Sequence, residues 1–272
     1  MKFYDCTTAP SPRRVRIFLA EKGISVPTVQ VDLRNGEQFS PAFRAINPDC
    51  TVPVLELDNG TRIADIVAIC RYFEELHPTP PLMGRTAEEK AVIEAWQRRI
   101  ERDGFYAAME ALRNSTPGLK GRALPGSESY EQIPALAERG RARIAHFFAW
   151  LGARLDENEF VCGPQFTIAD ITGLVTVGRG VAWASWRESA ESPRCPFCPA
   201  ASDGGASGAS LTAAPPAVSQ RSSVSTPVAE CERAVEKFNF FPLDGGRLGR
   251  GWVRQSTLAP HPDPPPRGGE GE

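Results

Sequence analysis

The chain has 272 residues, with 31 Lys and Arg against 33 Asp and Glu, so its formal net charge is −2 and its pI is about 6.0. Because this balance leaves no basic surplus to neutralise phosphates, it argues against a nucleic-acid-binding protein. No apolar run has the length of a membrane span or a signal peptide, so we expect a cytoplasmic protein without a membrane partner. The length suits one large domain or two small ones.

The chain begins with a strand–helix–strand pattern. Residues 2–5 form a short predicted strand, and residues 27–33 alternate β-branched side chains as a second strand does. Between them we expect a helix that starts at Ser11 and Pro12 and ends at Gly23. Ser11 suits the N-cap, and Pro12 suits the first helical position, where its missing N–H costs nothing.

A weakly helical stretch, residues 41–46, comes next. Residues 52–57 are predicted to form a strand, and the Asn-Gly pair at 59–60 predicts a hairpin turn into residues 61–63. Asp65 then caps a helix. A βαβ unit followed by a ββα unit predicts a small mixed sheet with helices on its faces, an α/β domain over residues 1–78.

After a proline-rich linker, expected at residues 79–86, the pattern becomes purely helical. Residues 87–113 predict one long amphipathic helix, and residues 133–155 predict a second. We assign residues 87–183 to an all-α domain.

A capping box begins the third helix of that domain. Thr167 suits the N-cap and Asp170 the N3 position, while Phe166 and Ile171 match the two positions of a hydrophobic staple. Both devices within six residues predict a buried helix that runs to about Val177.

The composition changes near Ser185, and Pro, Gly and Ser make up about a third of the remaining chain, a level typical of low complexity. We expect residues 184–272 to be a disordered tail, with a short helix at 228–241 as its one amphipathic fragment. Cys195 and Cys198 lie there. Because a single CxxC pair without further cysteines or histidines is a weak signal for zinc or redox chemistry, we expect no metal site.

Three positions of the first domain carry possible chemistry. A cis peptide bond at Val52–Pro53 would leave the main chain of Val52 free to pair with an extended peptide ligand; the alternative is an ordinary proline before a strand. The Asp65 carboxylate either only caps its helix or also binds a ligand ammonium group, while the helix N–H groups hold a carboxylate. The Ser11 hydroxyl likewise either caps or donates to a thiolate at the positive helix end.

Arg13 and Arg14 are unfavourable in the first turn of a helix because they oppose its dipole. They would be explained by a nearby anion, by a carboxylate on the second domain, or by exposure to solvent.

Taken together, these blocks resemble the cytosolic glutathione transferase family over about residues 1–183. The resembling blocks are Phe3-Tyr4-Asp5, residues 9–23, Asn47-Pro48, residues 52–55, residues 65–72 and the capping box at 166–170.

The resemblance implies a thioredoxin-like first domain that binds glutathione as co-substrate, an all-α second domain, and a homodimer. By analogy, Val52 pairs with the cysteinyl backbone of glutathione beside cis-Pro53, Asp65 faces the γ-glutamyl end, and Gln38 contacts the glycyl carboxylate. Ser11 is the expected thiol-activating residue.

The sequence departs from the family pattern at the helix that follows Asp65. The family usually has Glu-Ser where this chain has Asp65-Ile66, which removes one hydrogen bond to a charged ligand group, worth about 1.5–3 kcal/mol. The N–H of Ile66 remains.

A second departure concerns Ser11, because the subgroup that this start resembles often has Asn there. The alternatives for thiol activation are Cys6, Thr7, Thr8 and Tyr4, besides water and second-domain groups, although Tyr4 better suits a core strand position.

The implied reaction is attack of the glutathione thiolate on a small hydrophobic electrophile. Its pocket would be lined from the end of the first long helix by Tyr106, Met109, Arg113 and Asn114, although Met and aromatic residues at helical spacing also suit a core. Without the helices that the family has after the capping-box helix, that helix would leave apolar surface exposed. Two alternatives to a transferase therefore stay open: a non-catalytic binding module of the same fold, and a frame-shifted product without activity.

Overall fold

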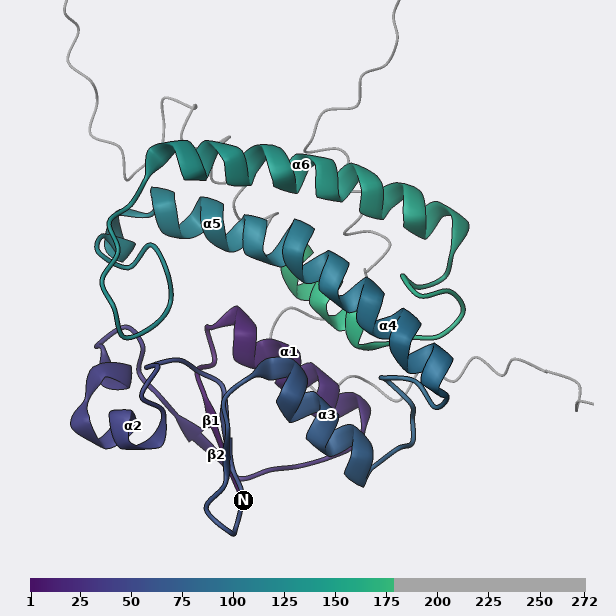
Figure 1. Ribbon diagram of the computed structural model, residues 1–272, viewed down its shortest axis with the longest axis horizontal. Helices are drawn as coiled ribbons and strands as arrows, with labels where there is room; N and C mark the ends of the chain where they lie inside the picture. The colour runs from purple at the N-terminus through teal and green to yellow at the C-terminus, as the bar shows by residue number, and fades with distance from the viewer. Residues whose placement is uncertain (179–272) are drawn as a thin grey trace, which may run out of the picture. The chain divides into compact units, whose positions relative to one another are not determined.

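A four-stranded sheet forms the first part of the protein, which a computed structural model describes over residues 1–178 (Figure 1). The strand order is β2-β1-β3-β4. β1 runs parallel to β2 and antiparallel to β3, and β3 runs antiparallel to β4. The strands are β1 Lys2–Asp5, β2 Thr28–Gln30, β3 Val54–Glu56 and β4 Arg62–Ile63. The predicted mixed sheet is confirmed.

β2 and β3 are shorter than predicted. β2 covers Thr28–Gln30 of the expected 27–33, lies at the edge of the sheet and has all three residues exposed. β3 begins at Val54 and not at Val52, because Pro53 has no N–H to donate to a ladder.

α1, Pro10–Glu21, begins before the predicted position. Its N-cap is Ala9, so the prediction that Ser11 caps this helix is wrong. Pro10 has the fixed φ of a first helical position, and a residue before proline favours the extended backbone that Ala9 adopts (φ −85°, ψ 137°). The end is as predicted, with Gly23 at φ +68° just after the helix.

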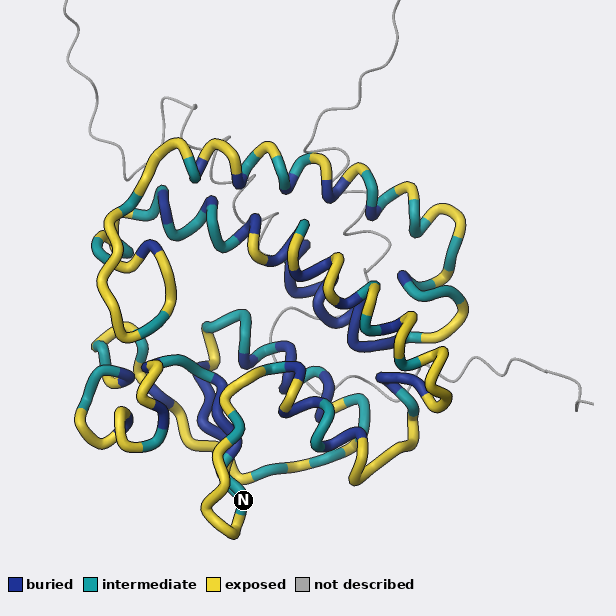
Figure 2. The backbone as a smooth tube through the Cα atoms, in the orientation of Figure 1, coloured by how far each residue is buried: buried dark blue, intermediate teal, exposed yellow. Residues whose placement is uncertain are grey.

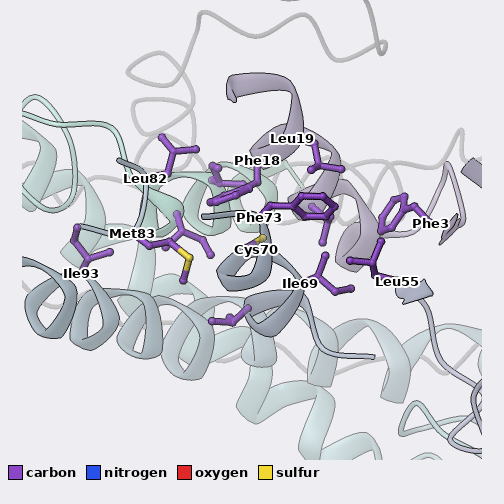
Figure 3. Close-up of a cluster of buried hydrophobic side chains, with 14 residues drawn as sticks. Phe3, Phe18, Leu19, Leu55, Ile69, Cys70, Phe73, Leu82, Met83 and Ile93 are labelled. Carbon is purple, nitrogen blue, oxygen red and sulfur yellow. The ribbon is translucent and has the colours of Figure 1, made fainter. Parts of the chain in front are cut away.

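The next helices follow the predicted order. η1, Glu37–Phe39, and α2, Pro41–Ile46, precede β3, and α3, Ile66–Leu76, follows β4. Asp65 is the N-cap of α3, and its carboxylate accepts the N–H of Ala68 at 2.9 Å. α1 and α3 pack against each other and the sheet around a buried cluster (Figure 3). That cluster includes Phe3, Phe18, Leu55, Ile69 and Phe73.

The predicted linker contributes to this cluster. Leu82 and Met83 are 3% and 1% exposed and pack into it (Figure 3). Lys22, the C-cap of α1, forms a buried ion pair with Glu74 of α3 at 2.7 Å, and Glu74 accepts the N–H of Met83 at 3.1 Å. Residues 82–84 of the predicted linker are therefore a core segment and not an exposed tether.

The first long helix has a wider turn in its middle. α4, Ala87–Ile100, continues through a π-helical turn, η2, Glu101–Phe105, into α5, Tyr106–Ser115. The predicted long helix over 87–113 is present as these three consecutive segments, but the sequence did not indicate the π-helical turn between them.

α6, Pro134–Glu157, packs along α5 and η2 at close range. A Cβ on Gly140 would lie 2.7 Å from the backbone nitrogen of Ala111, and a Cβ on Gly104 would lie 2.6 Å from the ring of Phe147. Figure 2 shows α6 burying the side that faces α5 and exposing its outer side. Glycine is required at both contacts.

A further helix spans residues 168–178 and begins at the predicted capping box. The Asp170 carboxylate accepts the N–H of Thr167 at 2.9 Å and that of Val161 at 2.8 Å, and it also accepts the Thr167 hydroxyl at 3.1 Å.

This helix is buried along its length, since every residue from 167 to 177 is buried. Ile168 and Ile171 belong to the cluster of α1 and α3, while Ala169 and Val177 belong to a second cluster with α5 and α6. The expectation that it exposes apolar surface is wrong, because it packs against both parts of the chain.

Residues 179–272 lie outside the described part, and so do the predicted tail, the predicted end of the helical domain, the fragment at 228–241 and the Cys195–Cys198 pair. Among residues 1–178, no helix is both long and apolar enough to cross a membrane.

Candidate active site

A pocket of about 610 Å³ brings together residues from the sheet region and the helical region. Its first wall is formed by residues 9–11, 14, 33, 38–39, 50–53, 64 and 66. Its second wall is formed by residues 105–106, 109–110, 113–114, 119, 122–126, 136 and 143. All but one of the predicted binding and pocket residues line it; the exception is Asp65.

Ser11 lines the pocket from the first turn of α1. Pro10 and Pro12 flank it and carry no N–H, so Ser11 alone offers an N–H among the first three residues of the helix. Since its side chain does not cap α1, the hydroxyl remains available to a ligand, next to the positive end of the helix dipole.

The alternatives to Ser11 do not line this pocket. Tyr4 is buried in a cluster with Phe43 and Val54, as a core strand residue should be. Thr7 donates its hydroxyl to Gln30, and Cys6 is buried. Thr8 also lies outside the lining.

Val52 and Pro53 form the centre of the first wall. Their peptide bond is cis, as expected. The β1–β3 ladder ends where Val54 pairs with Tyr4, so the main-chain groups of Val52 lie outside it.

Cys50 also lines the pocket, and no sequence pattern had selected it. It is buried with φ at +54°, a conformation that non-glycine residues rarely adopt, and its thiol lies 3.4 Å from the carbonyl oxygen of Pro48.

Gln38 lies in η1 at one end of the first wall. It is 7% exposed, and its amide oxygen has no hydrogen-bond partner within the described residues. A buried polar atom of this kind is costly unless a ligand or water satisfies it.

Asp65 and Ile66 lie at the other end. Ile66 lines the pocket and is the first residue of α3, so its N–H has no partner within the helix. Asp65 is exposed just outside the lining; one of its oxygens caps α3 and leaves the second for a ligand.

A buried ion pair joins the two walls. The Arg14 guanidinium donates to the Glu101 carboxylate at 2.7 Å, with side chains 2% and 4% exposed. It also lies 4.1 Å from the ring centre of Phe105. The wider turn of η2 places Glu101 and Phe105 together against Arg14. Of the three explanations for this arginine, a carboxylate in the helical region is correct.

Tyr106, Met109, Arg113 and Asn114 all line the second wall from α5. Tyr106 is 54% exposed and is therefore not a core residue. Partial burial and the charge of Glu101 raise the pKa of its hydroxyl above the ordinary value, so it is a neutral donor near pH 7. Asn114 accepts the N–H of Ile133 at 2.9 Å and so fixes the start of α6.

The loop at 117–133 completes the second wall, and no periodicity in the sequence indicated it. The Arg122 guanidinium lies 4.9 Å from the ring centre of Phe39 on the first wall. Because these two residues are far apart in the chain, only the structure shows that the loop reaches the first wall.

No group of three or more His, Cys, Asp or Glu side chains within residues 1–178 is arranged to hold a metal ion.

The chain is similar to known proteins over both regions. Residues 8–76 match the glutathione S-transferase N-terminal domain. Glutathione S-transferase 2 of Saccharomyces cerevisiae is 40% identical over 174 residues, which cover 63% of this chain and 72% of that protein. The chain belongs to the glutathione S-transferase family. The predicted family and the predicted α/β plus all-α fold are confirmed.

Two solved family structures extend this similarity to the arrangement of the helices. A glutathione S-transferase domain-containing protein of Marinobacter aquaeolei is 39% identical with a TM-score of 0.61, covering 69% of this chain and 88% of that one. Gtt2 of Saccharomyces cerevisiae is 33% identical with a TM-score of 0.61, covering 72% of this chain and 98% of that one.

Proposed function

We propose that the protein is a glutathione transferase that joins the thiolate of glutathione to a small hydrophobic electrophile. The observation that carries the proposal is the convergence of Ser11, the Val52 main chain and the start of α3 on one pocket. Across that pocket, Tyr106 and Met109 supply a partly apolar surface for the second substrate.

Glutathione would lie extended along the first wall. The N–H and carbonyl of Val52 pair with its cysteinyl residue as an added strand does. The second oxygen of Asp65 binds the γ-glutamyl ammonium group, and the N–H of Ile66 donates to the γ-glutamyl α-carboxylate at the positive end of α3. The glycyl residue then points toward Gln38.

Ser11 would stabilise the thiolate. A free thiol has a pKa of about 8.5, so only a few per cent is ionised at pH 7. A donated hydroxyl hydrogen bond, together with the N-terminal end of α1, lowers this pKa because both interact with the charged form. The thiolate then attacks the electrophilic carbon, the new S–C bond forms, and the leaving group departs with the electron pair of its broken bond.

Dimerisation, a role in detoxification and cytoplasmic location belong to the same proposal. Membership of the family supports a homodimer, and sedimentation equilibrium of the purified chain tests it. A single monomeric species at micromolar concentration would contradict that part of the proposal.

The binding part of the proposal is tested by Asp65→Asn. Asparagine caps helices as well as aspartate does, so α3 is kept while the charge that holds the ammonium group is lost. We expect affinity for glutathione, measured by titration calorimetry, to fall about 10- to 100-fold. Asp58→Asn, on the exposed hairpin, is the matched control and should bind as the native chain does. Unchanged affinity in Asp65→Asn would remove Asp65 from the site.

The chemical part is tested by Ser11→Ala and by turnover of a chloro-nitroaromatic substrate. The apparent pKa of bound glutathione, followed by thiolate absorbance, should rise by about one unit in the variant. No change would assign activation to water or to the second wall.

The absence of the family's Ser at Ile66 favours one alternative, a binding module without chemistry. Binding of glutathione without turnover of any electrophile would support that alternative. If the native chain neither binds glutathione nor turns over an electrophile, the protein has no transferase function.

A further inference from the structure

Four arginines line the pocket: Arg14, Arg113, Arg122 and Arg143. Two of them have a carboxylate partner: Arg14 pairs with Glu101 at 2.7 Å, and Arg143 pairs at 3.5 Å with Glu110, which it shares with Arg139. Glu110 is the only acidic residue among the described residues of the lining. Arg113 and Arg122 have no carboxylate within ion-pair distance anywhere in residues 1–178.

Arg113 lies in the last turn of α5 and is partly buried. Its guanidinium donates to the main-chain carbonyl of Arg122 at 2.9 Å, a contact that leaves its charge uncompensated. Burial and the nearby charge of Arg122 lower the pKa of Arg113 from its ordinary value. Two cations this close together repel each other unless an anion lies between or beside them.

Arg122 is held in place by the loop that carries it. Ser129 donates its hydroxyl to the Gly121 carbonyl at 2.8 Å, and the N–H of Tyr130 donates to the same carbonyl at 3.1 Å. Gln132 donates to the Arg113 carbonyl at 2.7 Å. These hydrogen bonds fix the backbone next to Arg122, and its guanidinium contacts the ring of Phe39.

The first wall offers a second, independent sign of a ligand at this end. Arg122 stacks on Phe39, and the neighbouring Gln38 has a buried amide oxygen without a partner in the described part of the chain. The buried oxygen of Gln38 is an acceptor in the same pocket as the Arg113 and Arg122 guanidinium groups, and together they match a ligand that carries an N–H next to a carboxylate. A peptide C-terminus has that chemistry.

We propose that Arg113 and Arg122 bind a substrate carboxylate across the top of the pocket. The inference rests on the proposed transferase function, because it assigns the charge of a substrate in that same pocket. Arginine suits the task, since its planar fork matches both oxygens of a carboxylate. The carboxylate comes either from the glycyl end of glutathione, with Gln38 accepting the glycyl N–H, or from the electrophile.

The first arm of the test compares glutathione with its glycine ethyl ester by titration calorimetry. If the glycyl carboxylate is the ligand, Arg122→Gln lowers affinity for glutathione about 10- to 100-fold and leaves affinity for the ester unchanged. Arg122→Lys restores part of the difference, because it returns the charge but not the fork. Arg102→Gln is the matched control, since Arg102 is an exposed arginine that pairs with Asp103 outside the pocket.

The second arm compares 4-chloro-3,5-dinitrobenzoate with its methyl ester, which share the reacting carbon and differ in charge. If the electrophile supplies the carboxylate, Arg122→Gln and Arg113→Gln lower kcat/KM for the acid about 10-fold or more and spare the ester. If Arg113→Gln has a lower melting temperature than the native chain, the variants of the exposed Arg122 decide the outcome.

If the native chain binds glutathione but the Arg122 variants change neither the affinity for glutathione nor kcat/KM for the acid, this inference is overturned. The proposed function then stays intact. A native chain that does not bind glutathione overturns the proposed function, and this inference falls with it.

Discussion

The two walls of the pocket differ in what they present to a ligand. The first wall offers mainly the main chain at helix starts and at the Val52–Pro53 turn, whereas the second offers long side chains such as Tyr106, Met109 and Arg113. Main-chain donors at a helix start are set by local sequence, and they suit a ligand that never changes. Side chains on one helix face can change singly without affecting the fold, and they suit a ligand that differs among relatives.

The largest effect is expected from removing the ion pair that joins the two walls. Glu101→Gln leaves the buried Arg14 guanidinium without a counter-charge, and we expect the free energy of unfolding in urea to fall by about 3–5 kcal/mol. The control is Asp103→Asn in the same turn, which removes the partner of the exposed Arg102 and should cost about 0–1 kcal/mol. Equal losses in the two variants would show that the pair does not join the walls.

The helix at 168–178 also joins the two regions, and Asp170 makes that junction depend on pH. Burial raises the pKa of Asp170 to about 6, against 3.8 for the unperturbed group. The folded state therefore gains stability from the protonated carboxyl below about pH 4, and this gain is lost as the pH rises through 6. Relative to Asp170→Asn, the native chain should lose about 3 kcal/mol between pH 4 and pH 7. Urea curves measured across this range test it, and parallel stability profiles would contradict it.

The second wall depends on close packing of α5 against α6, which Gly140→Ala tests without changing either wall's ligand groups. The added Cβ would lie 2.7 Å from the backbone of Ala111, where neither helix can yield by a rotamer change. We expect a loss of about 1–3 kcal/mol. Gly152→Ala, on the same helix with nothing within 4 Å of its Cβ, should instead gain about 0.5–1 kcal/mol. The same sign in both variants would contradict the packing argument.

The smallest expected effect sharpens the comparison at residues of the helical region that do not line the 610 Å³ pocket. Arg99 lies 4.0 Å from the ring centre of Trp150, which stacks on Trp96 at 5.7 Å. Arg99→Gln should cost about 0.5–1 kcal/mol in thermal or urea unfolding and leave glutathione binding unchanged. A change in that binding would mean that the two faces of the helical region are coupled.

Most of the binding groups at the first wall could be predicted from the sequence, because they depend on local features; Cys50 could not. Proline at Pro53, the N-cap at Asp65 and the polar Gln38 are all visible without knowing what packs against them. The error at Ser11 was also local: two prolines compete for the first helical turn, and the helix starts at the one that comes first in the chain.

The second wall was predicted only in part, since its face of α5 follows helical periodicity but its loop does not. Arg122 reaches Phe39 through a contact between segments far apart in the chain, and nothing near either residue indicates it. The π-helical turn was also missed; two of its residues, Glu101 and Phe105, contact Arg14 on another helix, and that contact is not visible in the local sequence.

The burial of Ile168 and Ile171 in the cluster of α1 and α3 has a consequence for how the chain is made. During synthesis, the sheet, α1 and α3 leave the ribosome well before Ile168 and Ile171, which cover part of their apolar cluster. At about 5–20 residues per second, the nascent N-terminal region waits on the order of ten seconds with part of its apolar surface in water. A fragment that stops at the end of α3 would keep that surface exposed permanently, and such a fragment should be recovered mainly from the insoluble fraction of an expressing cell.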